Sequence, residues 1–171
     1  MPRRPRIKLA GMPQHIVQRG NNRQVTFVAD ADYSFFRECV KDAADKYGCD
    51  IHAYVLMTNH VHLLASAERA YALSLIMQYV GRYFVRYINR VYRRSGTLWE
   101  GRFSSSLVDT ETYFLRCCRY IECNPVRAQM VRGPGEYRWS SYRSDALGVK
   151  DKLLVAHPQY ERLGNSDEER E

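Results

Sequence analysis

Two short β-favouring runs, separated by the dipeptide Thr58-Asn59, constrain the fold more than any other part of the sequence. Residues 51–57 and 60–66 are rich in apolar and β-branched side chains, so we expect two neighbouring antiparallel strands joined by a tight turn. Side chains two residues apart in a strand share one face of the sheet. His60 and His62 therefore lie on the same face, and the apolar residues between and after them point to the core.

Two imidazoles on one strand face supply half of a metal site, and the rest of the chain must supply a third ligand. The alternative is that the two histidines bind no metal and are simply buried and hydrogen-bonded. One candidate for the third ligand is His52 on the preceding strand. If His52 lies in register with His60 and His62, the three could bind zinc as in a small zinc hydrolase, but the sequence does not fix the face on which His52 lies.

The chain has 171 residues, of which 45% are hydrophobic, which is the size and composition of one globular domain. It has five cysteines, an odd number, and none of them forms a Cys-x-x-Cys pair. The N-terminal stretch lacks the apolar segment of a signal peptide. No apolar run reaches the roughly 18 to 20 residues that span a bilayer. We therefore expect a cytoplasmic protein with reduced thiols that does not enter a membrane.

The formal net charge of +7 is unevenly distributed along the chain. Residues 1–14 are basic and punctuated by prolines, which predicts an extended N-terminal arm. The basic residues that precede the first acid, Asp30, are Arg3, Arg4, Arg6, Lys8, Arg19 and Arg23. A polyanion such as nucleic acid is the partner that this charge favours, and the arginines of this set are candidate contacts to a DNA backbone.

Two long amphipathic helices are predicted from apolar residues at helical spacing. One covers residues 32–47 and ends before Gly48, and the other covers residues 71–92. The second helix carries an arginine face opposite its apolar stripe, and residues 70–99 contain no acidic side chain. The arginines of that face that we select as DNA backbone contacts are Arg82, Arg86 and Arg90.

The remaining elements are shorter. We expect strands at residues 15–18 and 102–108, and a helix that begins near Asp109. That helix ends near Asn124, because a proline disfavours the α conformation of the residue before it. Asn124 is also a suitable N-cap for a second short helix. The chain after residue 144 is expected to be a tail whose acidic end, from residue 165, is disordered.

Tyr120 and Asn124 are four residues apart and so share a helical face. Presented to His60 and His62, they would form a metal site with Asn124 as third ligand and a tyrosine nucleophile beside it. A phenol attacks poorly at neutral pH unless a cation stabilises the charge that develops on the phosphate. Nitrogen and oxygen ligands suit Mg²⁺ or Mn²⁺, with zinc as the other possibility. Spacing alone does not select Tyr120 from the chain's 13 tyrosines.

Five motifs between residues 3 and 144 carry a family resemblance. They are Arg19-Gly20-Asn21-Asn22-Arg23, the run from Ala53 to Leu64, Gly96 to Arg102, Arg119 to Ala128, and Tyr137 to Tyr142. In this order they resemble the single-tyrosine HUH transposases, specifically the REP-associated tyrosine transposases, which are related to the small insertion-sequence transposases. Asn124, four residues after Tyr120, resembles the REP-associated pattern, whereas the insertion-sequence branch typically has glutamine at this position.

The resemblance implies an α+β fold of ferredoxin-like (RRM-like) type, with a central antiparallel sheet and helices packed on it. It implies that His60 and His62 bind the divalent ion, while Asn124 is selected as the third ligand from its spacing to Tyr120. Tyr120 would attack a single-stranded DNA phosphodiester near a REP-like hairpin. The products would be a 5′-phosphotyrosine link and a free 3′-hydroxyl that can rejoin DNA.

The sequence divides into a basic arm (1–14), a transposase domain (15–144) and a C-terminal tail (145–171). Besides the nuclease and the zinc hydrolase, a third hypothesis stays open. The chain could be a transposase-derived protein that binds DNA or RNA hairpins for regulation and does not cut. The sequence does not decide between a monomer and a homodimer, nor whether Tyr120 serves the histidines of its own chain.

Overall fold

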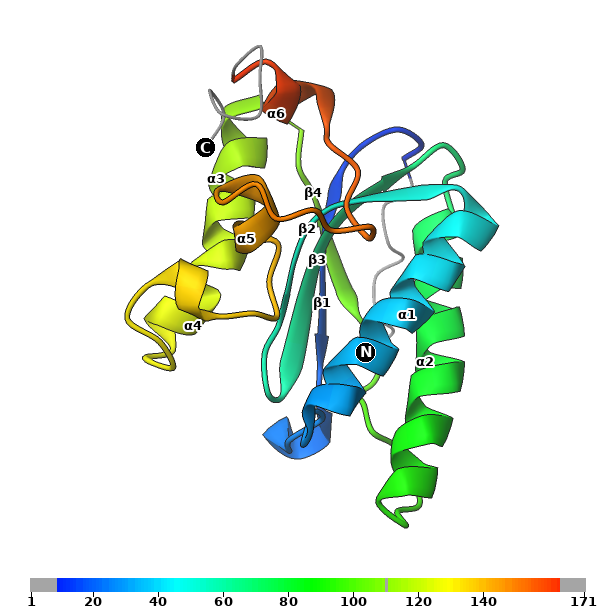
Figure 1. Cartoon of the computed structure of the whole chain (residues 1–171). Helices are drawn as coiled ribbons and strands as arrows, with labels where there is room; N and C mark the ends of the chain where they lie inside the picture. Colours follow the sequence, from blue (N-terminus) through cyan, green and yellow to red (C-terminus); the bar gives the residue numbers. More distant parts are fainter. Residues whose placement is uncertain (1–8, 110, 164–171) are drawn as a thin grey trace.

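A four-stranded antiparallel sheet with strand order β2-β3-β1-β4 forms the centre of the computed structural model, which describes residues 9–109 and 111–163 (Figure 1). The strands are β1 (Gln14–Arg19), β2 (Cys49–Leu56), β3 (His60–Ala67) and β4 (Ser104–Leu107). The predicted hairpin is confirmed, since β2 and β3 pair directly across the turn at Thr58-Asn59.

Two long helices, α1 (Asp30–Tyr47) and α2 (Ala72–Val91), pack together over one face of the sheet, and α3 (Glu111–Glu122) lies on the other face (Figure 1). The shorter helices are η1 (Asn21–Arg23), α4 (Asn124–Arg127), η2 (Pro134–Glu136), α5 (Tyr142–Asp145) and α6 (Pro158–Glu161). The order of strands and long helices is that of a ferredoxin-like α+β fold, as predicted.

Helix α1 ends where its sequence requires it to end. Gly48 has a left-handed backbone (φ 65°), and its N–H donates to the Ala44 carbonyl. At the other end of α1, the buried carboxylate of Asp32 accepts hydrogen bonds from the backbone N–H groups of Val28 and Ala29. The same carboxylate accepts the hydroxyl groups of Tyr87 in α2 and of Tyr92, the residue that follows α2. This buried acid therefore joins the start of α1 to the end of α2.

The segment after residue 144, expected to be a tail, packs on the body as far as residue 163. The Val155 N–H donates to the Ile51 carbonyl, and Leu154 forms a parallel bridge with Ile51. Helix α6 packs against α3. The acidic residues 165–171, like most of the arm at residues 1–8, lie outside the described residues. Within the described parts of the chain, no helix is both long and apolar enough to cross a membrane.

The loop after β1 is packed closely against the hairpin turn. The Gly20 N–H donates to the Asn59 carbonyl at 2.7 Å, and the Thr26 N–H donates to the Thr58 carbonyl at 2.8 Å. A Cβ atom added to Gly20 would lie 2.4 Å from the Gln24 carbonyl oxygen and 2.7 Å from the Thr26 methyl carbon. Glycine is needed here because there is no space for a side chain.

Replacing Gly20 with alanine is therefore expected to lower the free energy of unfolding by about 1–3 kcal/mol, the usual cost of overpacking. Gly81, inside α2, has no atom within 4 Å of an added Cβ and is the matched control. Gly81→Ala should raise stability by about 0.5–1 kcal/mol, because alanine favours helix. Urea unfolding of the two variants measures both effects, and equal stabilities would contradict this interpretation.

Candidate active site

The candidate metal ligands lie at the start of β3, on the sheet face that α3 covers. His60 pairs with Arg19 of β1, and His62 pairs with Val17, so the two imidazoles share a face as predicted. Their ring centroids are 5.0 Å apart. His62 is buried, with 5% of its surface exposed, while His60 is half-buried. The hairpin therefore fixes both side chains before any ligand binds.

His60 is held by the side chain that precedes it. Its Nδ1 lies 2.7 Å from the Asn59 Oδ1, and the Asn59 amide nitrogen donates to the Arg23 carbonyl at 3.1 Å. Burial, followed by the nearby charge of Arg19, lowers the pKa of His60, although a hydrogen bond with the Asn124 side chain acts in the opposite direction. His60 is therefore neutral at pH 7, the form in which histidine binds metals.

His62 makes its closest contact with a histidine of the neighbouring strand. The His15 Nε2 lies 2.8 Å from the His62 Nδ1. Burial lowers the pKa of His62 to about 3, with further contributions from His15, His60 and Arg19. Burial also lowers the pKa of His15. All three imidazoles at this site are thus neutral under physiological conditions.

Helix α3 brings Tyr120 to these histidines. The Tyr120 ring lies edge-on to His15 and to His62, with centroid separations of 5.9 Å in each case. Tyr120 is 42% exposed, so a large substrate can reach it. The guanidinium carbon of Arg127, in α4, lies 4.9 Å from the centroid of the Tyr120 ring. An exposed tyrosine is therefore placed between two neutral imidazoles and a cation.

Asn124 does not act as the predicted N-cap. It is the first residue of α4, the N-cap position is occupied by Cys123, and no side chain caps the helix. The Asn124 side chain instead forms a hydrogen bond with His60. The chain turns at Pro125 because proline cannot continue the hydrogen bonding of α3, and this turn directs Asn124 towards β3.

A pocket of about 490 Å³ opens beside Tyr120. It is lined by His15, Tyr113, Arg116, Cys117, Tyr120 and Arg127. Four of these residues follow the i, i+3, i+4, i+7 spacing of one α3 face. The two arginines, Arg116 and Arg127, give this pocket an affinity for anions.

Helix α3 is anchored behind Tyr120 by a buried carboxyl group. The Ser141 hydroxyl donates to Glu122 at 2.5 Å, and the same Ser141 oxygen accepts the Tyr54 N–H of β2 at 3.2 Å. Glu122 also shares a hydrogen bond with Asp145. Burial and the facing carboxyl group raise the pKa of Asp145 to about 9, and burial raises the pKa of Glu122. The pair therefore holds a proton at neutral pH.

This proton predicts a pH dependence of stability. A carboxyl group with a raised pKa stabilises the fold fully only below its unfolded pKa, near 4, and this contribution is lost as the pH rises through the folded value near 9. We expect the wild-type melting temperature to fall between about pH 5 and pH 9. Asp145→Asn should flatten this profile, and an unchanged profile in that variant would contradict a shared proton. Thermal melting across this range measures the effect.

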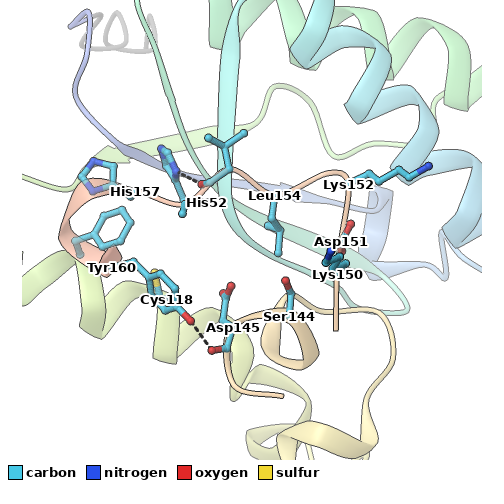
Figure 2. A pocket seen from close by; sticks show the side chains of 13 residues that line it. His52, Cys118, Ser144, Asp145, Lys150, Asp151, Lys152, Leu154, His157 and Tyr160 are labelled. Atoms are coloured by element: carbon cyan, nitrogen blue, oxygen red, sulfur yellow. Dashed lines mark hydrogen bonds between the residues drawn. The ribbon is translucent and has the colours of Figure 1, made fainter. Parts of the chain in front are cut away.

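A second cavity, of about 390 Å³, lies beside a different face of α3, at Phe114 and Cys118, and of the candidate metal ligands it contains only His52 (Figure 2). His52 lines it, but both ring nitrogens are engaged, one by the Val155 carbonyl and the other by the Ser66 hydroxyl. Asp151 is bound to Arg37 and to the Tyr54 hydroxyl. His52 and Asp151 thus serve the packing of the C-terminal segment.

The hypothesis of a zinc site formed by His52, His60 and His62 is wrong, because both ring nitrogens of His52 are engaged by other groups. His52 contacts Ser66, which is four residues beyond His62 on β3, or roughly 14 Å along the strand. Among the described residues, no three histidine, cysteine or carboxylate side chains are grouped to bind a metal. The candidate donor set therefore stays the two neutral imidazoles of His60 and His62, with the Asn124 side chain beside His60.

The candidate DNA-contacting arginines lie in three places. Arg19 and Arg23 are exposed at the end of the sheet that carries His60. Arg82, Arg86 and Arg90 are exposed on α2, across the sheet from α3 and Tyr120 (Figure 1). Arg3, Arg4 and Arg6 lie outside the described residues. The salt bridges among the described residues involve other arginines, namely Arg37, Arg138 and Arg162.

Sequence reasoning missed His15, Arg116 and Arg127. His15 lies in a predicted strand and has the alternation of a residue on the His62 face, but the sequence does not reveal that β1 pairs with β3. Arg116 is one helical turn before Tyr120 and could have been found from the i, i+4 spacing. Arg127 falls within a quoted motif, and its position over Tyr120 depends on the turn at Pro125.

The comparisons with known proteins agree with this fold. The family model "Transposase IS200 like" matches residues 8–124, so the chain belongs to this family of transposases. The structure is similar to that of a REP-associated tyrosine transposase bound to a REP hairpin, with a TM-score of 0.70 and 15% identity over 92% of this chain and 93% of that chain. This likeness confirms the predicted fold.

A second solved structure, a candidate transposase from Deinococcus radiodurans R1, is 18% identical and has a TM-score of 0.49. That match covers 70% of this chain and 95% of the other. No protein of curated function matches the chain.

Proposed function

We propose that this transposase is a metal-dependent single-stranded DNA nuclease and strand transferase with Tyr120 as its nucleophile. The observation that carries the proposal is the position of an exposed tyrosine against two neutral histidines in a chain of the IS200-like family. His60, His62 and Tyr120 of one chain lie together, which supports a nucleophile that serves the histidines of its own chain.

In the proposed reaction, the Tyr120 hydroxyl oxygen attacks a DNA phosphorus atom and loses its proton. The bond from phosphorus to the 3′ oxygen breaks, which leaves a 5′-phosphotyrosine and a free 3′-hydroxyl. Attack of a 3′-hydroxyl on the phosphotyrosine reverses these changes and rejoins DNA. The phosphorus keeps the same number of oxygen bonds throughout, so the reaction needs no external energy source.

His60, His62 and Asn124 would hold a divalent ion, Mg²⁺ or Mn²⁺. When bound, such an ion offsets the charge that develops on the phosphate oxygens. The residues of the chain itself hold the substrate. Arg116 and Arg127 line the pocket beside Tyr120 and can bind the phosphates on either side of the attacked bond.

Arg127→Ala is expected to lower the cleavage rate by roughly 10- to 100-fold, the cost of losing a hydrogen bond to a charged group. Arg127→Lys should restore only part of the rate, because lysine keeps the charge but not the planar fork. Arg132→Ala, which removes an exposed arginine outside this pocket, is the control. Single-turnover cleavage measures the rates, and equal rates for Arg127→Ala and Arg132→Ala would exclude this role.

The proposed substrate is a single strand next to a REP-like DNA hairpin, and the proposed place of action is the cytoplasm. The hairpin is the ligand of the structurally similar transposase, and the exposed arginines of this chain supply a backbone-binding surface. Because α2 and Tyr120 lie across the sheet from each other, a DNA molecule that contacts both has to pass around the sheet, and the end that carries the exposed Arg19 and Arg23 offers it a basic path.

The proposal is tested by incubating the protein with labelled oligonucleotides that carry a hairpin and a single-stranded flank, drawn from its own genome. With Mg²⁺ or Mn²⁺ we expect a covalent protein–DNA band on a denaturing gel, and with chelator no band. Tight binding without a band, insensitive to metal, would instead favour a regulatory protein that binds hairpins and does not cut.

A further inference from the structure

The Nδ1 atoms of both candidate metal-binding histidines are engaged by neighbouring side chains. For His60 the neighbour is Asn59, whose amide orientation is fixed because its nitrogen donates to the Arg23 carbonyl. The Asn59 oxygen can only accept, so His60 donates from Nδ1. In a neutral ring this leaves the lone pair on Nε2, the nitrogen that would bind a metal.

His62 has an equivalent contact, but its neighbour is another imidazole. The His15 Nε2 and the His62 Nδ1 are 2.8 Å apart, the ring planes differ by 19°, and the ring centroids are 5.1 Å apart. When two rings are nearly parallel and their nearest nitrogens are 2.8 Å apart, a centroid separation as large as 5.1 Å means that the rings lie edge to edge and not face to face. The contact is therefore an in-plane hydrogen bond, with one nitrogen donating and the other accepting.

Only one of the two possible proton arrangements leaves His62 able to bind a metal. If His15 donates, the neutral His62 must carry its proton on Nε2, which removes the lone pair from that nitrogen. If His62 donates from Nδ1, its Nε2 lone pair is free. An acceptor at the His15 position selects the second arrangement, as Asn59 does for His60.

We propose that His15 is a positioning residue that accepts the Nδ1–H of His62 and so holds His62 in its metal-binding tautomer and orientation. β1 fixes His15 in this place, since it lies diagonally across from His62 in the β1–β3 register. His62 is 95% buried, so water has little access to replace the missing acceptor. The ring of His15 also lies edge-on to Tyr120, which couples the orientation of His62 to the nucleophile.

This inference rests on the proposed metal site, and its test does not depend on DNA cleavage. The measurement is a titration of the full-length protein with Mn²⁺, with free Mn²⁺ detected by electron paramagnetic resonance. His15→Leu keeps an apolar side chain of moderate size but removes the acceptor. His15→Gln restores an acceptor near the position of Nε2, whereas His15→Asn has a side chain that is too short to reach His62.

We expect His15→Leu and His15→Asn to weaken Mn²⁺ binding by about 10-fold or more, the usual effect of losing a hydrogen bond to a metal-binding histidine. His15→Gln should stay within roughly 3-fold of the wild type. His157→Leu, which removes an imidazole at α6, should bind Mn²⁺ as the wild type does. Equal affinities for wild type, His15→Leu and His15→Asn would overturn the inference, as would a glutamine variant as weak as the leucine variant.

Two further variants separate the failure of this inference from the failure of the metal site. If His60→Ala and His62→Ala bind Mn²⁺ as the wild type does, the proposed metal site is wrong and the role of His15 falls with it. If these two variants lose binding while His15→Leu keeps it, only the role of His15 is wrong.

Nitrogen-detected NMR of the metal-free protein provides a readout that a merely structural role would not change. His62 should be protonated on Nδ1 in the wild type and in His15→Gln, and should become a mixture of tautomers in His15→Leu. A His62 protonated on Nε2 in the wild type would also overturn the inference.

Discussion

Tyr120→Phe is expected to abolish covalent attachment to DNA, with a loss of at least about 10³-fold in cleavage, because phenylalanine has no oxygen to form the phosphate ester. The ring remains, so the contacts with His15, His62 and Arg127 are retained. Hairpin affinity should therefore change by less than about 3-fold. Denaturing electrophoresis measures the adduct, and a gel-shift titration measures the affinity.

Tyr83→Phe is the matched control for that substitution. Tyr83 lies on α2 and is 44% exposed, close to the 42% of Tyr120, but it is on the opposite side of the sheet. It should form the adduct at the wild-type rate. A Tyr120→Phe protein that still forms the adduct would exclude Tyr120 as the nucleophile.

His62→Ala should have the second largest effect. Metal ions contribute several kcal/mol to transition-state charge stabilisation, so we expect cleavage in Mn²⁺ to fall on the order of 10²- to 10³-fold. His60→Ala should have a smaller effect on folding, because His60 is only half-buried. Cleavage rates across a range of Mn²⁺ concentrations check this prediction.

His52→Ala is the control for loss of a buried imidazole. His52 and His62 are 7% and 5% exposed, and both are hydrogen-bonded, but His52 lies at the other end of the sheet. The two variants should lose comparable stability, whereas only His62→Ala should lose metal-dependent cleavage at a temperature at which both remain folded. Similar cleavage losses in both would attribute the effect to folding rather than to metal binding.

The periodicity of the sequence was sufficient to predict the elements that hold the site. The β2–β3 hairpin follows from two β-favouring runs and a two-residue turn, and α1 and α2 follow from apolar residues at helical spacing. Alternation along β3 placed His60 and His62 on one face, because this property is local to a single strand.

The parts that sequence could not predict depend on contacts between distant segments. His15 reaches His62 only because β1 lies between β3 and β4. The turn at Pro125 was predicted, but whether the Asn124 side chain caps α4 or bonds to His60 depends on where α3 docks. The packing of Leu154 and Val155 on β2 follows from backbone bridges to Ile51 that leave no pattern in the sequence.

The most direct test of the central claim is to identify the amino acid and the DNA end that are joined. The wild-type protein is trapped on a hairpin oligonucleotide in Mn²⁺, digested with protease and nuclease, and analysed by tandem mass spectrometry. We predict a nucleotide linked through its 5′ phosphate to Tyr120. A link to any other residue, or a 3′-phosphate linkage, would contradict the account.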